Sequence, residues 1–220
     1  MATKSKEAEV QIVALDIKEV PIRIVGDTPL IVHAWSEKAK RMMLEAQQKA
    51  TKTKAKDIRD PFAEFMNSLY WLTDKPEEDT EEAFVKSVKD GAKFGFPVGA
   101  IKMAANSAAY RLGWVKNQMA LRGSYFLKSE FEYMAEIIGP APECREDMVR
   151  IGMGSADLRY RGEFKDWHMD FVLQYNASGA MTLEQILNCI NAGGYVCGIG
   201  EWRPERDGSN GCFHVEPINK

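Results

Sequence analysis

The residues WHMDFVLQYNASGAMTLEQILNCINAGG, numbers 167–194, decide the fold class of this chain. In the first nine, large apolar side chains alternate with polar ones, which predicts a strand with one buried face. Further on, Thr182 and Gln185 have the spacing of a capping box, and apolar residues then recur at helical spacing. We expect this helix to end at Gly193-Gly194. The stretch therefore predicts a half-buried strand followed by an amphipathic helix that covers it.

Working outward, a second pair of the same kind is expected nearer the start of the chain. Apolar and polar side chains alternate at the start of residues 19–32, which predicts a strand interrupted by a turn at Gly26–Pro29. An alanine-rich helix is expected after Pro97. Strands are expected to dominate residues 121–176. The order predicts an α+β fold, namely a ferredoxin-like or RRM-like βαββαβ sheet with its helices packed on one face and a large middle insertion.

The same patterns divide the chain into an arm and one domain. Residues 1–18 begin with a polar, charged stretch and are expected to form a flexible N-terminal arm. Residues 19–220 are expected to form a single domain. We interpret about 50–92 as an inserted surface element, because residues 74–82 are strongly acidic and a helix capped by Thr80 follows them.

Composition limits the classes of function. The chain has 220 residues, 45% of them hydrophobic, which suits one large domain with a substantial core. A dedicated duplex-DNA-binding protein is more often basic, so with a net charge of −3 any nucleic-acid role must depend on a local patch. Four cysteines without a CxxC pair, and three histidines, predict no metal site. No signal peptide or membrane span is recognisable, and we expect a soluble protein.

The C-terminal loop is the strongest candidate for a binding site. It contains Trp202, Arg203 and Arg206 among glycines, and glycine lets a backbone pass close to a neighbour. Arginine suits phosphates, and tryptophan can stack on bases. The alternative is that the glycines only form tight turns and that Trp202 covers the core. The loop glycines are Gly198, Gly200, Gly208 and Gly211.

Further basic and aromatic residues extend this candidate site. Arg159 and Arg161 lie two apart in a predicted strand and therefore share a face. Either that face is merely solvated, or a strand of nucleic acid runs along it. A basic run after residue 37 is usually only a solvated helix face. The complete expected nucleic-acid-binding set is Arg159, Arg161, Trp202, Arg203, Arg206, Lys102, Trp35, Lys38 and Arg41.

Three segments and their order resemble the RAMP superfamily, the RRM-like proteins of CRISPR systems. The segments are Gly-Asp-Thr-Pro-Leu-Ile at 26–31, the helix opening at 96–104, and the C-terminal glycine-rich loop. Pro97, Gly99 and Lys102 match the family's helix-opening segment loosely, without its Ser-Ser pair. The family includes a subunit that coats guide RNA as a helical filament. The resemblance implies the fold more than a function.

The chain also resembles a group of proteins of tailed bacteriophages and prophages, over nearly its whole length. The likeness rests on Pro-Leu-Ile-Val-His-Ala-Trp-Ser-Glu-Lys-Ala-Lys at 29–40, on 145–154, and on Gly-Ile-Gly-Glu-Trp-Arg-Pro at 198–204. This resemblance implies a phage origin and a place in the host cytoplasm. The group has no firmly assigned activity.

Together these observations predict a non-catalytic single-stranded nucleic-acid-binding protein of a bacteriophage, acting in DNA replication or recombination. The expected partners are single-stranded DNA or RNA and further copies of the chain, which would form filaments along the strand. No Walker loop, nucleophile elbow or HExxH sequence occurs, so we expect neither enzymatic activity nor a cofactor. Two alternatives remain: a virion structural or assembly protein, and a metal-independent endoribonuclease that uses His33.

Overall fold

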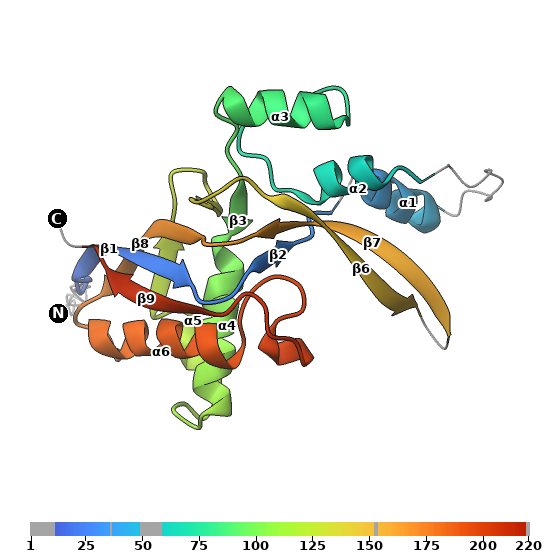
Figure 1. Ribbon diagram of the computed structural model, residues 1–220. Helices are drawn as coiled ribbons and strands as arrows, with labels where there is room; N and C mark the ends of the chain where they lie inside the picture. Colours follow the sequence, from blue (N-terminus) through green and yellow to red (C-terminus); the bar gives the residue numbers. More distant parts are fainter. Residues whose placement is uncertain (1–11, 36, 49–58, 152–153, 219–220) are drawn as a thin grey trace, which may run out of the picture.

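The computed structural model of the protein describes residues 12–35, 37–48, 59–151 and 154–218. Within them the chain forms an α+β structure with antiparallel sheets (Figure 1). The strands are β1 (Ile17–Gly26), β2 (Leu30–Val32), β3 (Gly95–Pro97), β4 (Tyr125–Lys128), β5 (Met134–Glu136), β6 (Glu143–Ile151), β7 (Ser155–Phe164), β8 (His168–Asn176) and β9 (Phe213–Pro217). The helices are α1 (Glu37–Gln47), α2 (Pro61–Ser68), α3 (Glu81–Lys89), α4 (Val98–Arg111), α5 (Met119–Arg122), α6 (Leu183–Val196) and the 3-10 turn η1 (Pro204–Arg206).

A four-stranded sheet carries the main core. Its order is β4-β8-β1-β9, and every neighbouring pair is antiparallel. Helices α4 and α6 pack on each other and lie against one face of this sheet (Figure 1). The alternation of apolar and polar side chains predicted for residues 167–175 is confirmed. Met169, Phe171 and Leu173 of β8 are buried, and the residues between them are partly exposed to solvent.

The capping box of α6 is confirmed. The Thr182 hydroxyl accepts from the Gln185 N–H at 3.2 Å, and the Gln185 side chain accepts from the Thr182 N–H at 3.0 Å. The predicted helix end at Gly193 is wrong, because α6 continues to Val196. A Cβ at Gly193 would lie 2.7 Å from the backbone nitrogen of Ala105 in α4. The glycine therefore serves close packing of two helices instead of a helix stop.

A second sheet, β2-β7-β6, continues from the first around a sharp corner. The turn predicted at Gly26–Pro29 joins β1 to β2, and the chain between β7 and β8 bends at the same place. The two bends are linked, because the Trp167 indole donates to the Thr28 carbonyl at 2.9 Å. Beyond the corner, β6 and β7 form a long hairpin that extends away from the body (Figure 1).

The region expected as a surface insertion contributes to the core. Phe65 and Met66 of α2 are buried next to β7, and Phe84 of α3 is buried with them. The expected surface element at about 50–92 is therefore partly interior, although residues 49–58 lie outside the described residues. At the N-terminus, β1 begins at Ile17, two residues before the expected start of the domain at residue 19, and residues 1–11 are not described.

Candidate functional site

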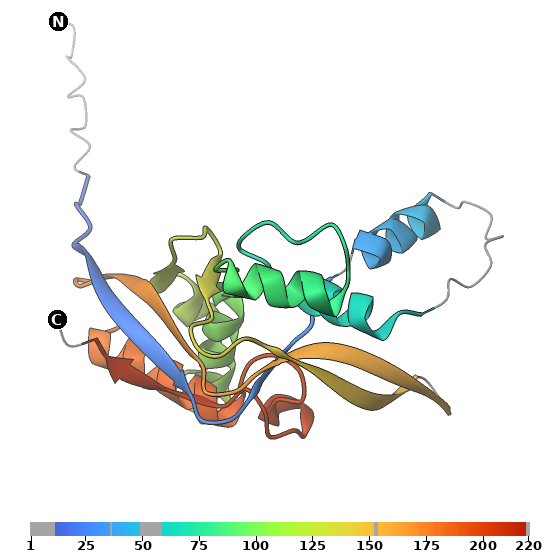
Figure 2. The same cartoon turned by 45° about the horizontal axis from the view of Figure 1, so that its top comes forward.

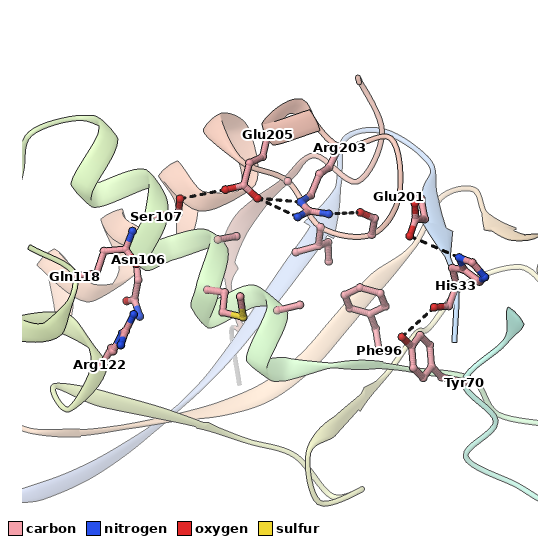
Figure 3. A pocket seen from close by; sticks show the side chains of 16 residues that line it. His33, Tyr70, Phe96, Asn106, Ser107, Gln118, Arg122, Glu201, Arg203 and Glu205 are labelled. Carbon is pink, nitrogen blue, oxygen red and sulfur yellow. Dashed lines mark hydrogen bonds and ion pairs between the residues drawn. The ribbon is translucent and has the colours of Figure 1, made fainter. Parts of the chain in front are cut away.

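The glycine-rich loop folds back beside α4 and leaves a cleft of about 460 Å³ (Figure 3). One side of the cleft comes from α4 and α5, and the other comes from the ends of β2 and β3 and the residues after α2. Its polar and aromatic lining residues are His33, Tyr70, Phe96, Asn106, Ser107, Gln118, Arg122, Glu201, Arg203 and Glu205. Residues as far apart in sequence as His33 and Glu205 thus line one hollow, and it is the natural candidate for a binding site.

The loop glycines approach the protein's own chain. Gly200 has a φ of +78°, and a Cβ there would collide with the Ile31 carbonyl of β2. Gly198 is close to Arg203 and Pro204, Gly208 to Trp202, and Gly211 to Ile199. The close backbone approach expected from the sequence is therefore accounted for by folding of the loop against itself and against β2. These contacts support the tight-turn interpretation of the glycines.

Arg203 and Glu205 attach the loop to α4. The Nε and Nη2 atoms of Arg203 donate to Glu205 at 3.1 and 3.0 Å, and its Nη1 donates to the Gly200 carbonyl at 3.0 Å. The second carboxylate oxygen of Glu205 accepts from Arg111 Nη2 at 2.9 Å and from the Ser107 hydroxyl at 3.2 Å. Burial alone would raise the pKa of Glu205, but the hydrogen bonds and positive charges around it outweigh burial and lower it.

His33 has a carboxylate partner that sequence reasoning missed. Its Nδ1 lies 3.8 Å from Glu201 Oε1, and the other oxygen of Glu201 lies 3.7 Å from Arg161 Nη2. The interaction with His33, helped by the charge of Arg161, lowers the Glu201 pKa against the opposing effect of burial. The Tyr70 hydroxyl donates to the His33 carbonyl at 3.4 Å (Figure 3). Only the return of the loop to β2 brings Glu201 to His33, and no sequence spacing indicates it.

Arg159 and Arg161 lie on β7, in the second sheet, and both are paired. Arg161 is buried, with Nη1 3.3 Å from Asp147 Oδ2. Arg159 is half-exposed, with Nε 2.7 Å from Asp157 Oδ2. The structure therefore does not present these two guanidinium groups as an open basic row.

Lys102 is not among the residues that line the cleft, and it attaches α4 to the end of α5 and to β4. Its Nζ donates to the carbonyls of Arg122 and Tyr125 at 2.7 and 2.6 Å, and it lies 4.6 Å from the centre of the Phe126 ring. Burial lowers the pKa of this amine. Two of its donors are thus used by main-chain carbonyls and the ammonium lies over an aromatic ring, so its role here is structural.

The remaining expected residues lie outside the cleft lining. Trp202 is 40% exposed and Arg206 is exposed, and among the described residues Arg206 has no ion pair. Trp35 follows β2 and is 63% exposed. Arg41, on α1, is 3.9 Å from Glu45 of the same helix. The side chain of Lys38, also on α1, is outside the described residues.

Arg122 is the cation that the sequence analysis missed. It ends α5, it lines the cleft, and its side chain is exposed. Its guanidinium makes no ion pair within the described part of the chain. Figure 3 shows it across the cleft from His33 and Tyr70. Residues 121 onward had been expected to form strands, and nothing in the pattern indicated the short helix that positions this side chain.

Ion pairs and hydrogen bonds between side chains cross the exposed face of the four-stranded sheet. Arg23 donates to both oxygens of Asp170 at 2.7 Å, and Lys128 donates to Glu19 at 2.7 Å. The aromatic side chains around β8, Trp167 and Phe171, are buried instead. RRM domains hold single strands on exposed aromatic side chains of the sheet, and this face offers no comparable row among the described residues.

Comparison with protein-family models and with curated proteins found no match. In the described ranges, no group of three or more His, Cys, Asp or Glu side chains is arranged to hold a metal ion. The described helices include none with the length and hydropathy needed to span a bilayer.

Proposed function

We propose that the protein binds single-stranded nucleic acid at the cleft between the glycine-rich loop and α4, without cleaving it. The observation that carries this proposal is the charge beside the cleft. Arg122 and Arg203 line the cleft, Arg111 lies beside it on Glu205, and the two carboxylates of the lining, Glu201 and Glu205, leave these three guanidinium groups in excess. Guanidinium groups bind phosphate oxygens with two parallel hydrogen bonds. The setting that we propose, from the resemblance to phage proteins, is phage DNA replication or recombination.

The topology supports the finer fold assignment that goes with this proposal. With α1–α3, α5, η1, β2, β3 and β5–β7 set aside as insertions and accessory elements, the order is β1-α4-β4-β8-α6-β9. That is the βαββαβ order of a ferredoxin-like or RRM-like domain. In this assignment the glycine-rich loop is the connection between the second helix and the last strand. We therefore infer a RAMP-like domain whose binding site is this loop and not the sheet face.

The physical character of binding follows from the local charge. The whole chain has a net charge of −3, so long-range attraction of a polyanion is weak and affinity depends on contacts at the cleft. For single strands the logarithm of the binding constant falls with log salt by about 0.7 for each phosphate contacted. Three contacts therefore correspond to a slope of about −2. Trp202, half-exposed in the loop, is the proposed stacking residue beside them.

The test is a titration of the full chain with fluorescently labelled single-stranded DNA, single-stranded RNA and duplex, at several salt concentrations. Arg122→Ala is expected to weaken single-strand binding about tenfold and to reduce the salt slope. Lys89→Ala, on α3, removes the same charge away from the cleft and is expected to leave binding unchanged. Equal effects of the two variants, or no binding of any oligonucleotide, would reject the cleft as the site.

A second candidate, a metal-independent endoribonuclease, is favoured by one observation, the pairing of His33 with Glu201. A carboxylate on one imidazole nitrogen orients the ring and leaves the other nitrogen for proton transfer. Incubation of the protein with labelled RNA in EDTA, with an all-deoxy oligonucleotide as the control, tests this candidate. RNA that stays intact, or that is cleaved equally by a His33→Ala variant, eliminates it.

A further inference from the structure

A polar side chain lies deep in the cleft, on the alanine-rich helix α4. Asn106 is only 5% exposed, and it belongs to the lining of the cleft. Most of the alanines of this helix are buried as well. A buried amide needs hydrogen-bond partners for both its oxygen and its nitrogen, because an unsatisfied polar group costs stability. The two ends of the Asn106 amide differ in this respect. The N-terminal segment that Figure 2 shows leaving the body of the protein lies apart from this site.

The amide oxygen of Asn106 is held by Tyr125. The Tyr125 hydroxyl, fully buried at the start of β4, donates to Asn106 Oδ1 at 3.1 Å. Burial raises the pKa of Tyr125, so the hydroxyl keeps its proton and acts as a donor. A donor on the oxygen fixes which way round the amide stands, and the NH2 group is turned away from Tyr125.

The amide nitrogen has no such partner. Asn106 Nδ2 makes no hydrogen bond to any residue that the structure describes, so its donors are satisfied only from the cleft. Figure 3 shows Asn106 at the same end of the cleft as Gln118 and Arg122. An amide that is fixed in this orientation presents donors to whatever occupies the cleft. It therefore binds hydrogen-bond acceptors of a ligand and disfavours donors.

The surroundings of the amide suit a nucleobase better than a phosphate. Phe96, Met103 and Ala104 give the cleft apolar lining. Met103, one helical turn before Asn106, is 73% exposed, so its thioether is available to cover an aromatic ring. A charged phosphate at this depth would lose its hydration, a penalty that is much smaller for a flat neutral ring. The guanidinium of Arg122 is exposed, and phosphates bound there stay in contact with solvent.

We propose that Asn106 reads one base of the bound strand and favours a carbonyl oxygen over an amino group on that base. This inference rests on the proposed binding of single strands in the cleft. A base that enters the cleft while its phosphates stay on the guanidinium groups leads with the edge farthest from its sugar. Thymine and uracil present O4 on this edge and guanine presents O6, whereas cytosine and adenine present an amino group. The subsite therefore prefers thymine, uracil or guanine.

Oligo(dU) and oligo(dC) of equal length test the preference, because their bases differ only along this edge. In fluorescence titrations at neutral pH and fixed salt, the full chain is expected to bind oligo(dU) about tenfold more tightly, since the cytosine amino group would meet the Asn106 donors. Arg122→Ala is expected to weaken binding of both by the same factor, because phosphate contacts are sequence-blind. Equal wild-type affinities, with both weakened by Arg122→Ala, would overturn the base preference alone. No binding of either oligonucleotide would overturn the proposed function as well.

Two substitutions locate the preference on the amide. Asn106→Leu keeps the approximate size of the side chain and removes its donors, so the affinities for oligo(dU) and oligo(dC) are expected to become equal. Tyr125→Phe keeps the amide but leaves it free to turn, and the same loss of preference is expected with binding retained. Asn67→Leu, which removes an amide on α2 outside the cleft lining, is the matched control and is expected to keep the preference. A preference that survives in Asn106→Leu or in Tyr125→Phe, with the fold intact by circular dichroism, would overturn the assignment.

Discussion

Arg161 and Glu201 join the second sheet to the glycine-rich loop, with 3.7 Å between Arg161 Nη2 and Glu201 Oε2. Arg161 is buried, and its other terminal nitrogen lies 3.3 Å from Asp147. The guanidinium thus stabilises two carboxylates, one on β6 and one at the edge of the cleft. A residue expected to contact nucleic acid is instead part of the framework that holds the cleft residues in place.

We predict that Arg161→Met destabilises the protein by about 3 kcal/mol, because the substitution leaves the nearly buried Asp147 carboxylate with less compensating charge. Arg159→Ala removes a half-exposed ion pair and is expected to cost less than about 1 kcal/mol. Urea unfolding of both variants measures the difference. Equal effects of the two substitutions would contradict the framework role of Arg161.

We predict that Gly193→Ala lowers the free energy of unfolding by about 1–3 kcal/mol, since the new Cβ would lie 2.7 Å from the Ala105 nitrogen and separate α6 from α4. Gly99→Ala is the matched control, because it is also helical and a Cβ there meets no atom within 4 Å. The control is expected to stabilise the protein by up to about 1 kcal/mol. Thermal and urea unfolding of both variants provide the measurement. A neutral Gly193→Ala would show that the helices are not in close contact.

We predict a pH-dependent contribution from His214 on the edge strand β9. A hydrogen bond with Asp27 (2.6 Å), and a weaker contact with Glu216, raise the pKa of His214 above 6.5 against a smaller opposing effect of burial. The folded state thus binds a proton more tightly than the unfolded state. The stabilisation is complete below pH 6.5 and is lost as pH rises through the raised pKa.

Because both side chains are over 40% exposed, we expect less than about 1 kcal/mol from this pair. The measurement is the stability difference between the wild type and His214→Gln from pH 5 to 9. The difference should shrink toward high pH. An Asp27→Asn variant removes the same hydrogen bond and should lose the same pH-dependent stabilisation. A stability difference between the wild type and His214→Gln that does not change with pH would contradict the assignment.

We predict that Glu205→Gln strengthens binding of single-stranded oligonucleotides at low salt. The carboxylate now neutralises part of the charge of Arg203 and Arg111, and the amide would leave their guanidinium groups more available to phosphate. One additional phosphate contact should steepen the salt slope by about 0.7. Weaker binding by this variant, with its fold intact by circular dichroism, would mean that Glu205 positions the loop and does not compete with phosphate.

Local patterns were sufficient to predict several elements. The alternation around β8, the Thr182 capping box and the turn after Gly26 each depend on neighbours within a few residues, and all three are present in the structure. Near-neighbour sterics and hydrogen bonds favour such elements before any tertiary contact forms. The α+β class follows from their order along the chain.

The candidate site could not be predicted in the same way, because it depends on contacts between residues distant in sequence. Glu201 meets His33, and Glu205 meets Arg111, only after the loop has folded back between β2 and α4. Whether an arginine is free or paired is likewise decided by the carboxylates that other elements bring to it, as for Arg161 and Arg122. A single sequence records the charge of each side chain and the local conformation it favours, whereas burial and pairing are set by which distant segments pack together.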